Sequence, residues 1–267
     1  MDELSLWMEP VSETTVNLKG EKSVPILSSG KEKMRLTVIL TARASGKKVK
    51  PFVIIPRKRP IKELEAMTDL HFGYSSKSWM NDGMTEKYLK SVIGSFAFAR
   101  RCIIWDSFYC HKSSATKKVL KQMRMDAIIV PSGCTGLIQA PDVSWNKSFK
   151  ANVRKEYENF ISVNGDNIPK PSFSTVAGWI SQSWDSIPEE QIARSMKQCG
   201  ITLEPDGSED EVLHCFHVLG NEEGLQILQK KRSEYTSCDL DATCDLDASS
   251  TYLSDDSISY CDSDESN

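Results

Sequence analysis

Three aspartates in this sequence stand where a fold could gather carboxylates around metal ions. Asp106 directly follows the apolar run Cys102–Trp105, and Asp142 follows Pro141 at the start of a long amphipathic segment. Asp2 heads another short apolar stretch. Carboxylate oxygens are the ligands that Mg²⁺ and Mn²⁺ prefer, and two such ions ~3.5–4 Å apart stabilise the attacking and the leaving oxygen of a displacement at phosphorus. Together the three aspartates therefore predict metal-dependent phosphodiester chemistry.

Each aspartate taken alone also has a purely structural interpretation. Aspartate is a favoured helix N-cap and a proline disfavours helix before it, so Asp142 could simply begin the long helix. Asp106 could be a loop or capping residue, and Asp2 could be a solvated terminal side chain. The functional interpretation depends on the combination, in which the three would project from two strand ends and a facing helix.

Composition indicates a globular chain with a reducing environment. The 267 residues suffice for one large domain or a domain with appendages, and 39% are hydrophobic. No apolar run reaches the roughly 18 residues of a membrane span, so we expect no membrane partner. The acidic N-terminus has no signal-peptide pattern, and the eight cysteines form no C-x-x-C pair. Such scattered thiols are typical of cytosolic or nuclear proteins.

The net charge of −4 conceals two regions of opposite sign. Residues 1–200 hold 30 Lys and Arg against 20 Asp and Glu, whereas residues 201–267 hold 3 against 17. A basic body suits a polyanion such as DNA, although it is also compatible with an ordinary soluble surface. Lys147, Lys150, Arg154 and Lys155 share one face of the long helix and are the predicted phosphate contacts, with a plain solvated face as the alternative.

The pattern of apolar residues predicts an α/β domain with a mixed sheet. Runs at 34–41 and 49–55 flank a turn at Ser45–Gly46 and predict an antiparallel hairpin, beside which Leu4–Met8 adds a third strand. The next expected elements are a helix over 83–95, a buried strand at 102–105, a helix from Ser113 or Ser114 to Met125, a buried strand at 127–130 and a helix over 143–162. Two shorter helices are expected at about 173–185 and 188–199. Residues from about 233 are too acidic and too poor in apolar side chains to fold, so we expect a disordered tail.

Several segments resemble the pogo/Tigger branch of the Tc1/mariner DDE transposases. The most specific is Leu137–Lys150 (LIQAPDVSWNKSFK), which is similar to that family's third catalytic block. Trp105–His111 (WDSFYCH) resembles the second block, and Lys77–Met84 (KSWMNDGM) resembles a stretch between the first and second. Met1–Glu3 resembles the end of the first block, and the likeness extends to about residue 212.

This resemblance implies an RNase H-like fold in which Asp2, Asp106 and Asp142 are both the catalytic and the metal-binding residues, with Mg²⁺ or Mn²⁺ as cofactor. It implies a DDE endonuclease domain over 1–165, a helical extension over 166–212 and an acidic, largely disordered tail over 213–267. An active member would cleave DNA strands at transposon ends and join them to target DNA. The expected location is the nucleus.

The sequence also departs from the family's pattern. Only Met1 precedes Asp2, the family's helix-turn-helix region is absent, and the proline of the third block stands next to Asp142. We therefore expect a truncated or transposon-derived product that binds DNA without sequence specificity, and its status as an enzyme stays open. The main interpretation is a transposase-derived nucleic-acid-binding domain whose ancestral Mg²⁺-dependent strand cleavage and transfer can have been lost. The alternatives are an active metal-dependent endonuclease or strand-transferase and a non-catalytic nuclear protein-interaction domain whose partners bind the acidic tail.

Overall fold

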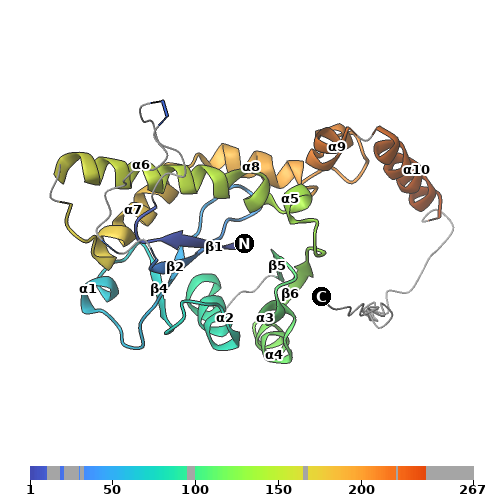
Figure 1. The fold of residues 1–267 in the computed structure, drawn as a ribbon. Coiled ribbons are helices and arrows are strands. Elements are labelled where there is room, and N and C mark those ends of the chain that lie inside the picture. Colours follow the sequence, from blue (N-terminus) through green and yellow to red (C-terminus); the bar gives the residue numbers. More distant parts are fainter. Residues whose placement is uncertain are drawn as a thin grey trace, which may run out of the picture.

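The computed structural model describes residues 1–10, 19–20, 30, 33–94, 100–164, 168–220 and 222–238 and contains two β-sheets (Figure 1). The first sheet has the order β1-β2-β3-β4, formed by Asp2–Trp7, Arg35–Leu40, Phe52–Ile55 and His71–Tyr74. Its first three strands are antiparallel and β4 is parallel to β3. The second sheet pairs β5 (Arg101–Trp105) with β6 (Met125–Ile129) in parallel.

The predicted α/β class, the antiparallel meander and the later parallel pair are confirmed, but the single mixed sheet is not observed. One backbone bond, from the Met1 nitrogen to the Ile104 oxygen at 2.8 Å, joins the start of β1 to β5. One bond is too little for a ladder, so the parallel pair forms a sheet of its own. Strand β4 was not predicted because it is short and contains Gly73, where a side chain would come within 2.9 Å of Phe52 and Met84.

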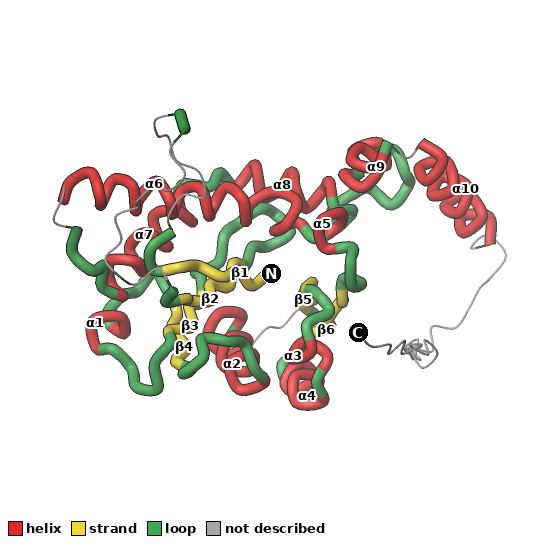
Figure 2. Tube along the Cα trace, in the orientation of Figure 1, coloured by secondary structure: helices red, strands yellow, loops and turns green. Residues whose placement is uncertain are grey.

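Helices cover the first sheet on both faces (Figures 1 and 2). Their bounds are α1 Lys62–Glu65, α2 Asp82–Tyr88, the π-helical turn η1 Leu89–Ile93, α3 Tyr109–Lys112, α4 Ser114–Gln122, α5 Thr135–Ile138, the π-helical turn η2 Pro141–Trp145, α6 Asn146–Asn164, α7 Phe173–Asp185, α8 Glu189–Gln198, the 3₁₀ turn η3 Asp210–Val212, α9 His214–Leu219 and α10 Glu222–Cys238. The predicted helices over 143–162, 173–185 and 188–199 correspond to η2 with α6, to α7 and to α8.

The first sheet separates two apolar cores because side chains alternate along each strand. On β2, Val38 and Leu40 enter the core beneath α6, α7 and α8, whereas Ile39 enters the core shared with α2, α4 and β5. Trp145 at the end of η2 stacks on Trp184 of α7, with 5.2 Å between ring centroids. This packing fixes the start of α6, and with it Asp142, above the edge of β1.

Two expectations about burial and helix ends differ in the structure. The strand expected to be buried at 127–130 is mostly exposed, and the Ile128 side chain is 54% accessible, because a two-stranded sheet has only one covered face. Asp142 lies inside the π-helical turn, after Pro141, instead of capping α6. The extra turn arises because the helical segment begins at Pro141, which suits a first helical position.

The C-terminal region begins with ordered helices. Within the segment predicted as a tail from residue 213, α9 and α10 are formed and lie beyond α5 in Figure 1. The rest of that tail, residues 239–267, lies outside the described residues, so its disorder stays a prediction. None of the helices in the described residues is long and apolar enough to cross a membrane.

Candidate active site

Asp2 is a buried carboxylate held by two side-chain amides. It is the first residue of β1, and only 9% of its surface is accessible. The Nε2 atom of Gln139 donates to its Oδ1 at 2.9 Å, and the Nδ2 atom of Asn146 donates to its Oδ2 at 2.5 Å. Both amides come from the α5–α6 region, so these bonds fix the edge of the sheet against the start of α6.

Asp142 is joined to Asp2 through the same amide. Asn146 lies four residues after Asp142, on the same helical face, and its Nδ2 also donates to Asp142 Oδ1 at 3.1 Å. Unlike Asp2, the Asp142 side chain is exposed. A buried carboxylate and an exposed one therefore share a single neutral donor.

The two carboxylates of this pair repel each other, and the Met1 ammonium group beside Asp2 offsets the repulsion only in part. Burial, followed by repulsion from Asp142, raises the pKa of Asp2 to about 7, although the bond from Asn146 partly opposes the rise. Near neutral pH, Asp2 is therefore close to half-protonated. A cation beside the two carboxylates would favour the ionised form.

The same two amide side chains also carry oxygen atoms without a partner. The Oε1 atom of Gln139 and the Oδ1 atom of Asn146 are buried and have no hydrogen-bond donor. Buried polar atoms normally have partners, so two orphaned acceptors next to two carboxylates call for a ligand. Because all these atoms are oxygens, the donor set fits a hard divalent cation such as Mg²⁺.

Asp106 is held in a different way, in the turn that follows β5. Its Oδ1 accepts bonds from the Phe108 backbone nitrogen at 3.1 Å and from the Nδ1 atom of His111 at 2.8 Å. Burial alone would raise the pKa of Asp106, but these bonds outweigh it and the pKa lies below its ordinary value. Asp106 is therefore ionised at neutral pH.

His111 connects the Asp106 turn to β1. Its Nε2 lies 3.0 Å from Glu3 Oε1, and its ring stacks on Trp105 with centroids 4.2 Å apart. Burial lowers the pKa of His111, but the two flanking carboxylates raise it to about 9. The imidazolium is thus a buried positive charge between Glu3 and Asp106, and it links the two sheets beside the candidate site.

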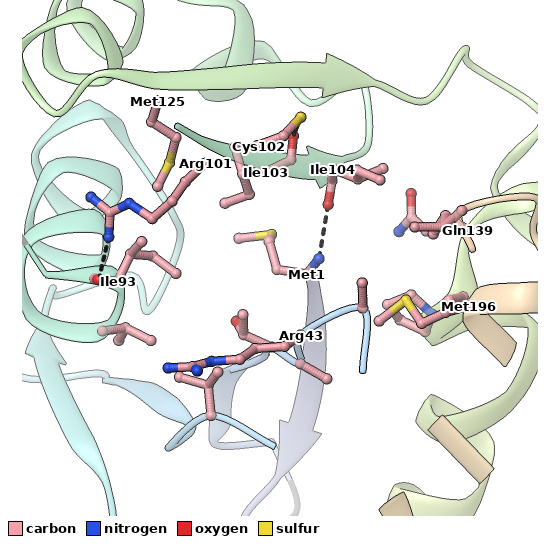
Figure 3. Close-up of a pocket in the computed structure, with 18 residues that line it drawn as sticks. Met1, Arg43, Ile93, Arg101, Cys102, Ile103, Ile104, Met125, Gln139 and Met196 are labelled. Carbon is pink, nitrogen blue, oxygen red and sulfur yellow. Dashed lines mark hydrogen bonds between the residues drawn. The ribbon is translucent and has the colours of Figure 1, made fainter. Parts of the chain in front are cut away.

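The structure thus brings two of the three predicted aspartates, Asp2 and Asp142, to one shared amide, that of Asn146. Asp106 is linked to this pair indirectly, through His111 to Glu3 and through the Met1 ammonium group, which lines the pocket of Figure 3 and whose charge acts on both Asp2 and Asp106. Within the described ranges, no three acidic, histidine or cysteine side chains are grouped closely enough to hold a metal. The predicted three-carboxylate site therefore stays a prediction.

Three residues of this site were not predicted to have a role. Gln139 and Asn146 stand three residues before and four after Asp142, a spacing that places them near its carboxylate in a helical segment. That spacing was a usable signal. Glu3 could not have been found in this way, because its partner His111 is distant in sequence.

The predicted DNA-contacting residues lie on α6, beginning one turn after Asp142. Lys147, Lys150 and Lys155 are exposed, whereas Arg154 is half-buried. Phe149 and Val153 on the opposite face are fully buried in the core. The basic face is therefore presented to solvent on the same helical segment that carries Asp142.

Comparison with known proteins identifies the family. The chain belongs to the family described as "DDE superfamily endonuclease", whose family model matches residues 33–196, more than half of the chain. Asp106 and Asp142 lie inside the matched range, and Asp2 lies before it. The resemblance to pogo-like DDE transposases is thereby confirmed at the level of the family.

Two curated relatives carry the name "Pogo transposable element with KRAB domain". The mouse protein is 28% identical over 218 residues, which are 77% of this chain and 36% of that protein. The human protein is 28% identical over 222 residues, which are 79% of this chain and 36% of that protein. The chain therefore spans about a third of the length of these relatives.

Two solved structures show a more distant likeness. They are "Crystal structure of the Mos1 Strand Transfer Complex", with a TM-score of 0.45 and 12% identity, and "Mos1 transposase paired-end complex with left transposon end", with 0.47 and 9%. Each alignment covers 74% of this chain and 50% of the Mos1 chain. Likeness at this level assigns no residue of this chain a role.

Proposed function

We propose that this domain binds DNA and holds one divalent cation, Mg²⁺ or Mn²⁺, between Asp2 and Asp142 against a DNA phosphate. The observation that carries the proposal is the Asp2–Asn146–Asp142 cluster. The pKa of Asp2 is raised there, and the amide oxygens of Gln139 and Asn146 are buried without a hydrogen-bond partner. Membership of an endonuclease family supports DNA as the partner. A bound cation would neutralise and polarise a phosphate oxygen.

The surface around the cluster supports the same proposal. The phosphate backbone supplies most of the non-specific affinity of DNA-binding proteins, and Lys and Arg side chains neutralise it. Lys147 and Lys150 are exposed on α6 next to Asp142, so a strand whose phosphate lies at the cluster would pass over this face. The binding we propose is independent of DNA sequence and takes place in the nucleus.

The decisive measurement is DNA binding as a function of salt. We expect Lys147→Ala combined with Lys150→Ala to weaken binding of a fluorescent duplex and to reduce the slope of log K against log salt by about 1–2. Lys118→Ala combined with Lys121→Ala removes the same charge from α4 and is the matched control. An equal loss in both double variants would refute the α6 surface as the binding face.

A second candidate, strand cleavage, is favoured by Asp106. The carboxylate is ionised, and both of its hydrogen bonds use Oδ1, so Oδ2 has no hydrogen-bond donor among the described residues. Its turn is tied through His111 to Glu3, the neighbour of Asp2. A movement of this turn toward Asp2 would complete the three-carboxylate arrangement that an RNase H-like endonuclease domain over residues 1–165 requires.

Nicking of supercoiled plasmid with Mn²⁺ tests this candidate. Cleavage by the wild-type chain that is lost in both Asp106→Ala and Asp142→Ala would establish it. Nicking that survives both substitutions would come from a contaminant, and no nicking with normal DNA binding would leave the first proposal as the function.

A further inference from the structure

The solvent-facing side of α6 is positively charged along its first half. Lys147, Lys150 and Lys155 are exposed there, and none of the ion pairs formed within the described part of the chain includes them. Two acids, Glu156 and Glu158, come only after these lysines. The first half of α6 therefore presents positive charge at which an acidic chain can bind.

The last part of the sequence carries the opposite charge. Residues 239–267, here called the acidic segment, follow α10 and lie outside the described residues. They contain eight Asp and one Glu but no Lys or Arg. These nine negative charges come close to balancing the excess of ten positive charges in residues 1–200. The acidic segment is thus complementary in charge to the body of the protein.

The helix from which the acidic segment leaves is tied to α8. Arg232 lies six residues, or roughly 9 Å, before the end of α10. Its guanidinium donates to the Pro205 oxygen at 2.7 Å and to Asp210 Oδ1 at 2.8 Å. The loop that contains these acceptors is held to α8 by the ion pair of Lys197 with Glu209. The start of the acidic segment is therefore anchored close to α8.

Helix α8 is bonded in turn to the start of α6. The Nε2 atom of Gln191 donates to the hydroxyl oxygens of Ser144 and Ser148, at 3.1 Å each. In Figure 1, α9 and α10 lie at the same end of the molecule as α5, which precedes the turn that holds Asp142. The acidic segment therefore starts from the end of the molecule at which the α6 lysines lie.

The length of the acidic segment is sufficient to reach α6. As a disordered chain, which remains our prediction, 29 residues span about 30 Å on average, and repulsion between like charges extends them further. A tethered ligand of this kind has an effective concentration on the order of millimolar. The other exposed lysines considered above, Lys118 and Lys121 of α4, lie beyond the first sheet, because α4 packs into the opposite core.

We propose that the acidic segment binds along the exposed face of α6, with its carboxylates beside Lys147, Lys150 and Lys155, and that it excludes DNA from this face. The segment carries about one charge per three residues, whereas duplex DNA carries one per about 1.7 Å of its axis. DNA therefore binds when it makes enough phosphate contacts to displace the segment. The exclusion of DNA rests on the function proposed above, whereas the contact with α6 does not.

Carbodiimide crosslinking of the whole chain without DNA tests the contact itself. The reagent joins a carboxylate to a lysine amine as an amide and is hydrated to a urea. In the monomer band, we expect amides from the acidic segment to Lys147 or Lys150 to be at least about fivefold more abundant than amides to Lys118 or Lys121. They should disappear at about 1 M salt, where the screening length is roughly 3 Å. Equal abundance on both helices would overturn the proposal.

A variant with a neutral segment tests the exclusion of DNA. It replaces every Asp and Glu of residues 239–267 by Asn and Gln. We expect it to bind a duplex about tenfold more tightly than the native chain at low salt, with a ratio that shrinks as salt rises. In the Lys147→Ala and Lys150→Ala background the gain should be less than about threefold, whereas the Lys118→Ala and Lys121→Ala background should keep the gain of about tenfold.

The outcomes separate this proposal from the function on which it rests. An equal gain in both lysine backgrounds would show general repulsion of DNA by the acidic segment and would overturn its binding to α6. If neither the native chain nor the neutral variant binds the duplex, the proposed function fails, and the crosslinks alone decide whether the segment contacts α6.

Discussion

The two ends of the candidate site hold the same residue type in opposite environments. Asp2 is buried beside another carboxylate and between neutral amides, and its pKa rises to about 7. Asp106 receives a bond from the imidazolium of His111, and its pKa falls below the ordinary value. The difference shows that Asp106 has the imidazolium of His111 as a counter-charge, whereas the positive charge that acts on Asp2 is the Met1 ammonium group, whose pKa burial lowers to about 6.

The largest expected effect comes from removing the charge beside Asp106. His111→Ala leaves Glu3 and Asp106 facing each other, removes the stack on Trp105 and opens a cavity. We expect the free energy of unfolding in urea to fall by about 2–4 kcal/mol. His217→Ala, at an exposed position on α9, should change it by less than about 0.5 kcal/mol. Similar losses in both variants would mean that the His111 link between the two sheets contributes no more to the free energy of unfolding than an exposed histidine does.

A divalent cation should stabilise the protein through Asp2 and Asp142 and not through Asp106. At tenfold its dissociation constant, Mn²⁺ should raise the free energy of unfolding of the wild-type chain by about 1.4 kcal/mol. Asp142→Asn should lose this gain, and Asp185→Asn, an exposed control on α7, should keep it. Thermal unfolding with and without EDTA makes the measurement. Stabilisation that persists in Asp142→Asn would place the ion elsewhere.

The pH dependence of the metal-free chain should reveal the repulsion between the two carboxylates. Because the pKa of Asp2 is raised by folding, its contribution to stability is full below about pH 4 and declines as the pH rises to about 7. In Asp142→Asn, burial still raises the pKa of Asp2, but the repulsion between the two carboxylates is gone. We therefore expect the loss of stability between about pH 4 and 7, measured in EDTA, to be smaller by about 1 kcal/mol than in the wild type.

The control for this comparison is again Asp185→Asn. Urea unfolding from pH 4.5 to 8 should give it the wild-type curve, so that the contribution of His111, which is lost between about pH 6.5 and 9, cancels between the proteins. Superimposable curves for Asp142→Asn and the wild type would contradict the pairing of Asp2 with Asp142.

Local patterns in the sequence predicted most elements that surround the site. The hairpin of β2 and β3 followed from β-branched runs around Ser45–Gly46, and α7 followed from its helical spacing. Strand β4 could not be predicted, because it forms by pairing with β3 around a close approach at Gly73. The exposure of Ile128 could not be predicted either, since the apolar character of a strand does not show whether helices cover both of its faces.

The sequence by itself determined the residue types of the site and their order along the chain. It placed Asp2, Asp106 and Asp142 at the ends of apolar segments, and it placed Asn146 one helical turn after Asp142. Only the tertiary structure decided that Asp2 meets Asp142 while His111 ties Asp106 to Glu3. Contacts between segments more than a hundred residues apart depend on how sheets and helices pack, and local spacing carries no information about that packing.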